Sequence, residues 1–186
     1  NQKCQIIGAG SNLLINNIFL KGLIICTKKL RSIKIEPQSG LVEGEAGAML
    51  PILSNLLAKN GLQGGEWAIG IPGTLGGAIY MNAGSGAVSL AKNLISVRVI
   101  DSKTLKTFEI DKKDMAFKYR FSPFQDNNLK IISAKLRFEP KGNIEELIRK
   151  TKNNLKIKTQ TQPYHLPSFG SIFQNPERNY AAKLID

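Results

Sequence analysis

The chain has 186 residues, a net charge of +12 at neutral pH and a hydrophobic fraction of 42%. This composition is typical of a folded globular chain and excludes an intrinsically disordered one. Two cysteines and one histidine are too few for a zinc cluster, a disulfide scaffold or a histidine-rich catalytic centre, so we expect no metal site. The positive charge favours an anionic partner, such as nucleic acid, anionic lipid or a phosphate-bearing small molecule.

Hydrophobic periodicity predicts a mixture of strands and helices along the chain. Strands are expected at 4–7, 23–27, 32–36, 41–45, 94–101, 106–110 and 130–138, with turns at 37–40 and 102–104. One helix is expected at 48–60, where leucines recur at helical spacing before Gly61. A second should follow Asn143, which can cap a helix with Glu146 in its first turn. A last helical pattern covers 180–185.

The sequence changes character after Pro140-Lys141-Gly142. We place a domain boundary at 139–142, with one domain at 1–139 and the beginning of a second at 140–186. Because the chain starts in a strand-like stretch and stops in a helical one, we expect a fragment that lacks both ends. The two cysteines, Cys4 and Cys26, have no metal-like spacing and indicate a reducing compartment, so we expect a cytoplasmic protein.

Two broad functions suggested by composition are disfavoured by pattern. The uncharged run 68–91 is long enough to cross a bilayer, but it holds Pro72 and six glycines, whose lipid-facing backbone would leave unpaired amides. Basic residues are scattered apart from short groups at 28–31 and 150–152, and no run alternates them with aromatic residues. We therefore expect no membrane span. Binding of nucleic acid is disfavoured and is kept only as a weak alternative.

The segment 8–14 follows the first strand and is the first candidate binding loop. Its two glycines let the backbone approach a ligand and free several N–H groups for an anion, and Ser11 and Asn12 add donors. Leu13 stands where the dinucleotide-binding fingerprint has its third glycine, so a Rossmann site is not expected. A purely structural turn explains the segment about as well.

Glycines are unusually dense in 70–78, and Asn82-Ala83-Gly84 continues this pattern. Glycine costs conformational entropy, so its density needs a physical reason. Either two backbones pack very closely here, or a large flat ligand lies against the main chain. The residues alone favour neither interpretation.

Two further features could carry chemistry. The segment 168–176 holds Ser171 and Asn175, but it lacks a G-x-S-x-G elbow and His165 is the one possible histidine partner, so a serine hydrolase is disfavoured. Arg120 follows Tyr119 in a polar-aromatic stretch. For a lone arginine, a surface or structural ion pair is the simpler interpretation.

Taken in order, the segments 8–14, 43–47, 70–78, 82–84, 119–120 and 170–176 resemble the bacterial family of UDP-N-acetylenolpyruvoylglucosamine reductases, flavoenzymes of peptidoglycan precursor synthesis. The resemblance covers nearly the whole chain. It implies an α+β fold, in which a FAD-binding domain of the vanillyl-alcohol oxidase (PCMH) type precedes the start of a smaller α/β substrate-binding domain. The short connection 84–94 indicates the type II branch.

The resemblance also implies a reaction and a set of site residues. The family uses NADPH and FAD to reduce UDP-N-acetylglucosamine enolpyruvate to UDP-N-acetylmuramate. Arg120 matches the arginine that stabilises charge at the substrate carboxylate, Ser171 matches the proton donor, and Tyr119 and Asn175 match substrate-binding positions. The residues matched to the cofactor are Gly8, Ala9, Gly10, Ser11, Asn12, Leu13, Gly70, Ile71, Pro72, Gly73, Thr74, Gly76, Gly77, Ala78, Asn82 and Gly84.

Two points leave the assignment open at the sequence level. The family has a third catalytic residue, a glutamate near its C-terminus, and no residue after Ser171 matches it, so weak or absent catalysis is expected from this chain alone. The alternative to the reductase is a different FAD-dependent oxidase or dehydrogenase of the same superfamily. Many of those proteins tether FAD through cysteine or histidine, and here Cys4, Cys26 and His165 are the candidates.

Overall fold

The computed structural model describes residues 4–16, 22–86, 88–162, 166 and 170–185. The strands in this part are β1 (Cys4–Ile7), β2 (Leu23–Cys26), β3 (Ile33–Glu36), β4 (Leu41–Glu45), β5 (Gly84–Ser85), β6 (Val88–Ser89), β7 (Leu94–Asp101), β8 (Thr107–Asp111) and β9 (Leu129–Arg137). The α-helices are α1 (Leu50–Lys59), α2 (Leu75–Tyr80), α3 (Ile144–Thr161) and α4 (Ala181–Ile185), and a 3₁₀ helix, Glu66–Gly70, lies between α1 and α2.

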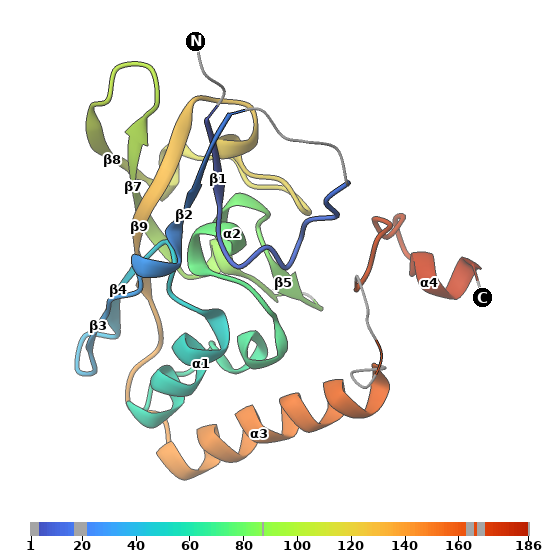
Figure 1. Ribbon diagram of the computed structural model, residues 1–186. Coiled ribbons are helices and arrows are strands. Elements are labelled where there is room, and N and C mark those ends of the chain that lie inside the picture. Colours follow the sequence, from blue (N-terminus) through green and yellow to red (C-terminus); the bar gives the residue numbers. More distant parts are fainter. Residues whose placement is uncertain (1–3, 17–21, 87, 163–165, 167–169, 186) are drawn as a thin grey trace.

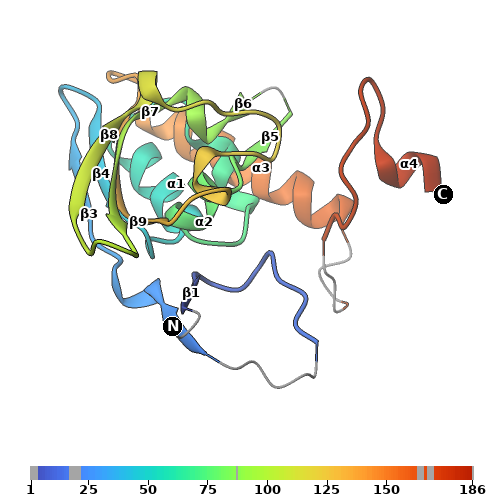
Figure 2. The same ribbon diagram turned by 90° about the horizontal axis from the view of Figure 1, so that it is seen from above.

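An antiparallel sheet with the strand order β3-β4-β9-β7-β8 forms the centre of the described structure. Helices α1, α2 and α3 lie on one face of this sheet (Figures 1 and 2). Strands β1 and β2 pair in parallel as a separate ribbon, and β5 and β6 form a short antiparallel hairpin. Segregated helices and an antiparallel sheet make an α+β fold, which confirms the expected class.

Most predicted elements are confirmed, with boundaries that differ by a few residues. Helix α1 begins at Leu50 rather than at residue 48, with Pro51 in its first turn, where the missing N–H of proline costs nothing. The cap of α3 is confirmed, because Asn143 Oδ1 accepts a hydrogen bond from Glu146 N at 3.0 Å. The hairpin β5–β6 was not predicted, since strands this short have no readable period.

The uncharged run 68–91 folds as several short elements rather than as one helix. It contains the end of the 3₁₀ helix, then α2, then the hairpin β5–β6. Across the described ranges, no helix has both the length and the apolar character that crossing a membrane requires.

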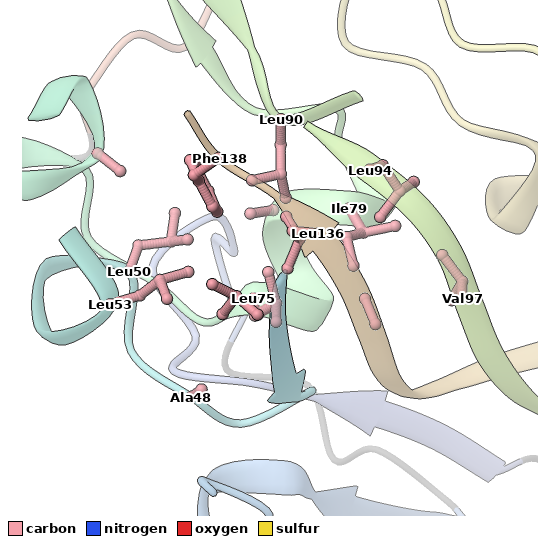
Figure 3. Close-up of a cluster of buried hydrophobic side chains, with 14 of the residues drawn as sticks. Ala48, Leu50, Leu53, Leu75, Ile79, Leu90, Leu94, Val97, Leu136 and Phe138 are labelled. Carbon is pink, nitrogen blue, oxygen red and sulfur yellow. The ribbon is translucent and has the colours of Figure 1, made fainter. Parts of the chain in front are cut away.

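The hydrophobic core lies between the sheet and the helices (Figure 3). Val97 and Leu136 from the sheet pack with Leu53 of α1 and Leu75 of α2, and each of these side chains is at most 1% exposed. All the buried members of this cluster fall within 42–138, and α3 covers it from outside. The separation of a second domain at 139–142 stays a prediction.

Helix α1 offers a matched pair for testing this core, because Leu53 is 1% exposed and the adjacent Ile52 is 54% exposed. Leu53→Ala should lower the free energy of unfolding by about 2–5 kcal/mol, since it removes buried methyl groups and leaves a cavity. Ile52→Ala should change it by less than about 1 kcal/mol. Urea denaturation followed by the fluorescence of Trp67 measures both, and equal losses would contradict this core.

Candidate functional site

Two of the candidate motifs, which lie 61 residues apart in sequence, contact each other directly. Ser11 Oγ donates a hydrogen bond to the carbonyl oxygen of Pro72 at 3.1 Å. A Cβ added to Gly8 would lie 2.4 Å from Thr74 Oγ1, and one added to Gly73 would lie 2.9 Å from Ser11 Oγ. The loop 8–14 therefore rests on the segment 70–74, and both contact points require glycine.

The loop 8–14 leaves several backbone donors for a ligand. Gly10 has a φ of 77°, and the loop closes on itself where Leu13 N donates to Gly10 O at 3.2 Å. Within the described residues, the N–H groups from Ala9 to Asn12 donate to no protein acceptor. Successive free N–H groups in a turn are suited to bind phosphate oxygens, which is the expected role of this loop.

Gly76 and Gly77 differ in what a side chain at each position would meet. Gly76 is needed for packing, because its Cβ would lie 2.9 Å from the Cβ of Ala46. Gly77 is exposed, and its Cβ would meet Thr74 Oγ1 at an ordinary 3.5 Å. The fold therefore requires glycine at 76 but not at 77, where the bare backbone is open to a flat ligand. The packing interpretation holds at Gly76, and the flat-ligand interpretation at Gly77 stays a prediction.

Gly70 is contacted from α3 by the long side chain of Lys158. Lys158 Nζ donates to the carbonyl oxygen of Gly70, and a Cβ on Gly70 would lie 2.5 Å from Lys158 Cδ. Lys158 is half-buried, and this burial lowers the pKa of its ammonium group. The sequence carried no signal for this contact, because a lysine near the end of a helix is normally explained by the helix dipole.

Arg120 lies beside another predicted site residue, Gly84. Its guanidinium Nη2 donates to the carbonyl oxygen of Gly84 at 3.4 Å, and its guanidinium carbon lies 5.0 Å from the centre of the Tyr119 ring. Gly84 tolerates no side chain, because a Cβ there would lie 2.2 Å from the carbonyl oxygen of Val88. The structure thus brings the arginine to the end of the glycine-rich stretch.

The side chain of Asn82 is used within the protein. Its Nδ2 donates to Lys118 O at 2.9 Å, and its Oδ1 accepts from Ala91 N at 3.4 Å. Asn82 is buried and holds the chain that leads to Arg120 against the end of α2. A direct contact between Asn82 and a cofactor stays a prediction.

The segment that carries Ser171 lies apart from the sheet and its helices, beyond the end of α3 (Figures 1 and 2). Ser171 and Asn175 are exposed, and Asn175 Oδ1 accepts a local hydrogen bond from Ala181 N at 3.0 Å. The structure does not bring Ser171 together with Arg120, so their convergence on one substrate stays a prediction. His165 lies outside the described residues.

Comparison with known proteins matches the chain to a family model and to named relatives. The model of the FAD binding domain family matches residues 1–106. A UDP-N-acetylenolpyruvoylglucosamine reductase of Prochlorococcus marinus subsp. pastoris (strain CCMP1986 / NIES-2087 / MED4) is 75% identical over 186 residues, which cover 100% of this chain and 63% of that protein. A protein of the same name from Prochlorococcus marinus (strain MIT 9313) is 46% identical over 183 residues, or 98% and 60% of the two chains.

A solved structure of a reductase from another organism has a similar fold. The UDP-N-acetylenolpyruvylglucosamine reductase (MurB) of Thermus caldophilus matches with a TM-score of 0.81 and 28% identity, over 99% of this chain and 65% of that chain. The chain therefore spans less than two thirds of the length of these relatives.

The family match covers more than half of the chain and includes the two loops that meet at Ser11 and Pro72. The free N–H groups of the first loop and the open backbone at Gly77 fit a dinucleotide with a flat ring. The chain belongs to the FAD-binding domain family, as its resemblance to flavoenzymes implied.

Proposed function

We propose that this chain carries the flavin-binding part of an NADPH-dependent UDP-N-acetylenolpyruvoylglucosamine reductase. The observation that carries the proposal is the 75% identity over all 186 residues with a protein of that name. The TM-score of 0.81 to a reductase structure also supports it. The substrate is UDP-N-acetylglucosamine enolpyruvate and the product is UDP-N-acetylmuramate.

Bound FAD would supply the transfer of two electrons from NADPH to the enolpyruvyl group. The loop 8–13 would hold the FAD pyrophosphate through the N–H groups from Ala9 to Asn12, which have no protein acceptor among the described residues. The exposed backbone at Gly77 would let the flat ring approach the main chain.

Arg120 would stabilise charge on the substrate. When the enolpyruvyl group accepts an electron pair, negative charge develops at its carboxylate, which is already an anion. A guanidinium is always charged and has five N–H donors, and the bond to Gly84 O occupies one nitrogen. The other donors can bind a carboxylate in a bidentate way. Fixed charge of this kind lowers a barrier by about 3–4 kcal/mol in a site that excludes water.

Ser171 would supply the proton for the carbon next to the carboxylate. A serine hydroxyl is a weak acid in water, but a carbanion-like acceptor is a strong base, so a positioned hydroxyl can serve. Tyr119 and Asn175 would contact the sugar nucleotide. Both side chains are exposed, which supports their availability to a substrate.

The proposal carries expectations about partners and location. FAD, NADPH and the UDP-sugar are all anions, which fits the net charge of +12. A cytoplasmic location fits Cys4 and Cys26, which are both free thiols in the structure.

One experiment decides between this proposal and a different flavin enzyme of the same superfamily. The complete protein is reduced with NADPH without oxygen, and UDP-N-acetylglucosamine enolpyruvate is then added. Return of the oxidised flavin absorbance is expected, together with release of all flavin into the supernatant after acid denaturation. Flavin that stays attached to Cys4, Cys26 or His165 would favour the oxidase or dehydrogenase alternative.

Gly76 and Gly77 form a matched pair for the flavin site. Gly77→Ala should leave the free energy of unfolding within about 1 kcal/mol of the original, because its Cβ meets only an ordinary contact and alanine favours a helix. It should nevertheless weaken FAD binding at least about tenfold, a loss of about 1.4 kcal/mol. Gly76→Ala should instead destabilise the apoprotein, because its Cβ meets Ala46. Flavin fluorescence titration and urea denaturation measure the two effects, and unchanged FAD affinity in Gly77→Ala would contradict the open-backbone interpretation.

Arg120→Ala should slow flavin reoxidation by the enolpyruvyl substrate by about 10²–10³-fold, since it removes the charge proposed at the carboxylate. Reduction of the flavin by NADPH should keep its rate. Arg120→Lys keeps the charge without the planar fork, so its reoxidation rate should fall between those of the original protein and Arg120→Ala. Stopped-flow absorbance separates the two half-reactions, and an undiminished reoxidation rate in Arg120→Ala would remove the arginine from this role.

Ser171→Ala should retain bound flavin and the oxidation of NADPH by artificial electron acceptors, but lose enolpyruvyl reduction by about 10²–10⁴-fold. Glu177→Ala, another exposed position in the same segment, serves as the control and should keep the full rate. Normal turnover of the substrate by Ser171→Ala would show that the proton comes from elsewhere.

A further inference from the structure

Arg120 occupies a backbone conformation that its residue type disfavours. Lys118 N donates to Phe121 O at 3.2 Å and Phe121 N donates to Lys118 O at 3.1 Å, so Tyr119 and Arg120 form a two-residue turn. Arg120 has a φ of 54°, where glycine or asparagine is normal. A residue held in this region persists only where its surroundings determine the conformation. The surroundings that do so can be named.

Gln125 contacts the backbone of this turn directly. Its Nε2 donates to Arg120 O at 3.1 Å and to Tyr80 O at 2.7 Å, and it lies 3.7 Å from Met81 Sδ. A carboxamide NH₂ has two hydrogens, one for each carbonyl oxygen. The opposite orientation would place the amide oxygen against two carbonyl oxygens, so the contacts themselves determine which way the group points.

The bond to Tyr80 connects the turn of Arg120, through α2, to the loop 8–14. Tyr80 is the last residue of α2, and this helix begins after Thr74, which contacts Gly8 of the first loop. Ser122 Oγ also donates to Tyr80 O, at 2.7 Å, so two side chains from one distant loop use the carbonyl that ends the helix. Gln125 alone among the described side chains binds both this carbonyl and that of Arg120.

We propose that Gln125 is a positioning residue for Arg120. Its carboxamide keeps the strained turn docked on the end of α2, so that the guanidinium is presented beside Gly84. This inference rests on the proposed function, because it assigns Gln125 to the half-reaction in which Arg120 meets the substrate carboxylate. Gln125 touches neither substrate nor cofactor in this role and acts through Arg120.

The test compares three substitutions in the complete protein loaded with FAD. Gln125→Met has a similar length without donors, Gln125→Glu places an acceptor against two carbonyl oxygens, and Gln125→Lys restores N–H donors. We expect the first two to lower kcat for enolpyruvyl reduction by about 10- to 100-fold, as small misplacements of catalytic groups do. Flavin reduction by NADPH should be unchanged, and Gln125→Lys should recover most of the lost rate. Equal losses in both half-reactions would overturn the proposal.

A double substitution tests whether Gln125 acts through Arg120. The variant that combines Arg120→Ala with Gln125→Met should reoxidise its flavin no more slowly than Arg120→Ala alone, because the positioned group is already gone. Independent, multiplying losses would overturn the proposal.

A measurement without substrate separates this inference from the proposed function. Hydrogen exchange of the Phe121 amide, which closes the turn, should be faster in Gln125→Met than in the original protein, and Gln125→Lys should restore it. If the unsubstituted protein fails to reduce the enolpyruvyl substrate, the proposed function is lost. Unchanged exchange in Gln125→Met would instead refute the positioning role alone.

Discussion

Three backbone hydrogen bonds join the turn after β4 to the segment that enters α2. Gly76 N donates to Ala46 O at 2.8 Å, Leu75 N donates to Ala48 O at 2.8 Å, and Leu50 N donates to Gly73 O at 3.0 Å. At Gly76 the two segments lie so close together that an added Cβ would be 2.9 Å from the Cβ of Ala46. The loop 8–14 rests on the joined segment, and the turn that carries Arg120 is docked on the helix that follows it. Both parts of the site therefore take their position from this contact.

The site combines two opposite uses of backbone conformation. At Gly8 and Gly84 the absence of a side chain permits close contact with a neighbouring segment, which a Cβ would prevent. At Arg120 the left-handed conformation is occupied by a large side chain, against its intrinsic preference, and neighbouring groups must hold it there. The first use shapes the surface that we propose for the cofactor. The second determines where a single permanent charge is presented.

The proposed phosphate loop, residues 8–14, contains no lysine or arginine, so the net charge of +12 comes from other parts of the chain. Among the described residues, Lys135 forms a partly exposed ion pair with Glu109 at 3.0 Å on the face of the sheet away from the helices. The pKa of the Glu109 carboxyl is lowered, mainly by a hydrogen bond from Ser96 and to a smaller extent by Lys135. In the loop 8–14 the donors that we propose for a phosphate are backbone N–H groups rather than lysines. A general positive field favours anionic ligands, but oriented dipoles determine where they bind.

The local features of this protein could be predicted from its amino-acid sequence alone. Residues close together in the chain produce the strand and helix periods, the Asn143 cap and the glycine-rich loops. The resemblance to flavin reductases likewise rests on short motifs, each of them local. Which glycine serves packing and which faces outward depends on tertiary contacts, because a Cβ would meet Ala46 at 2.9 Å at Gly76, but only Thr74 Oγ1 at an ordinary 3.5 Å at Gly77. The tertiary structure also decided the contacts of Arg120 with Gly84, of Gln125 with Tyr80 and of Lys158 with Gly70, which span 36, 45 and 88 residues. No local pattern encodes such pairs, since they form only when packing of the core closes the long loops between them.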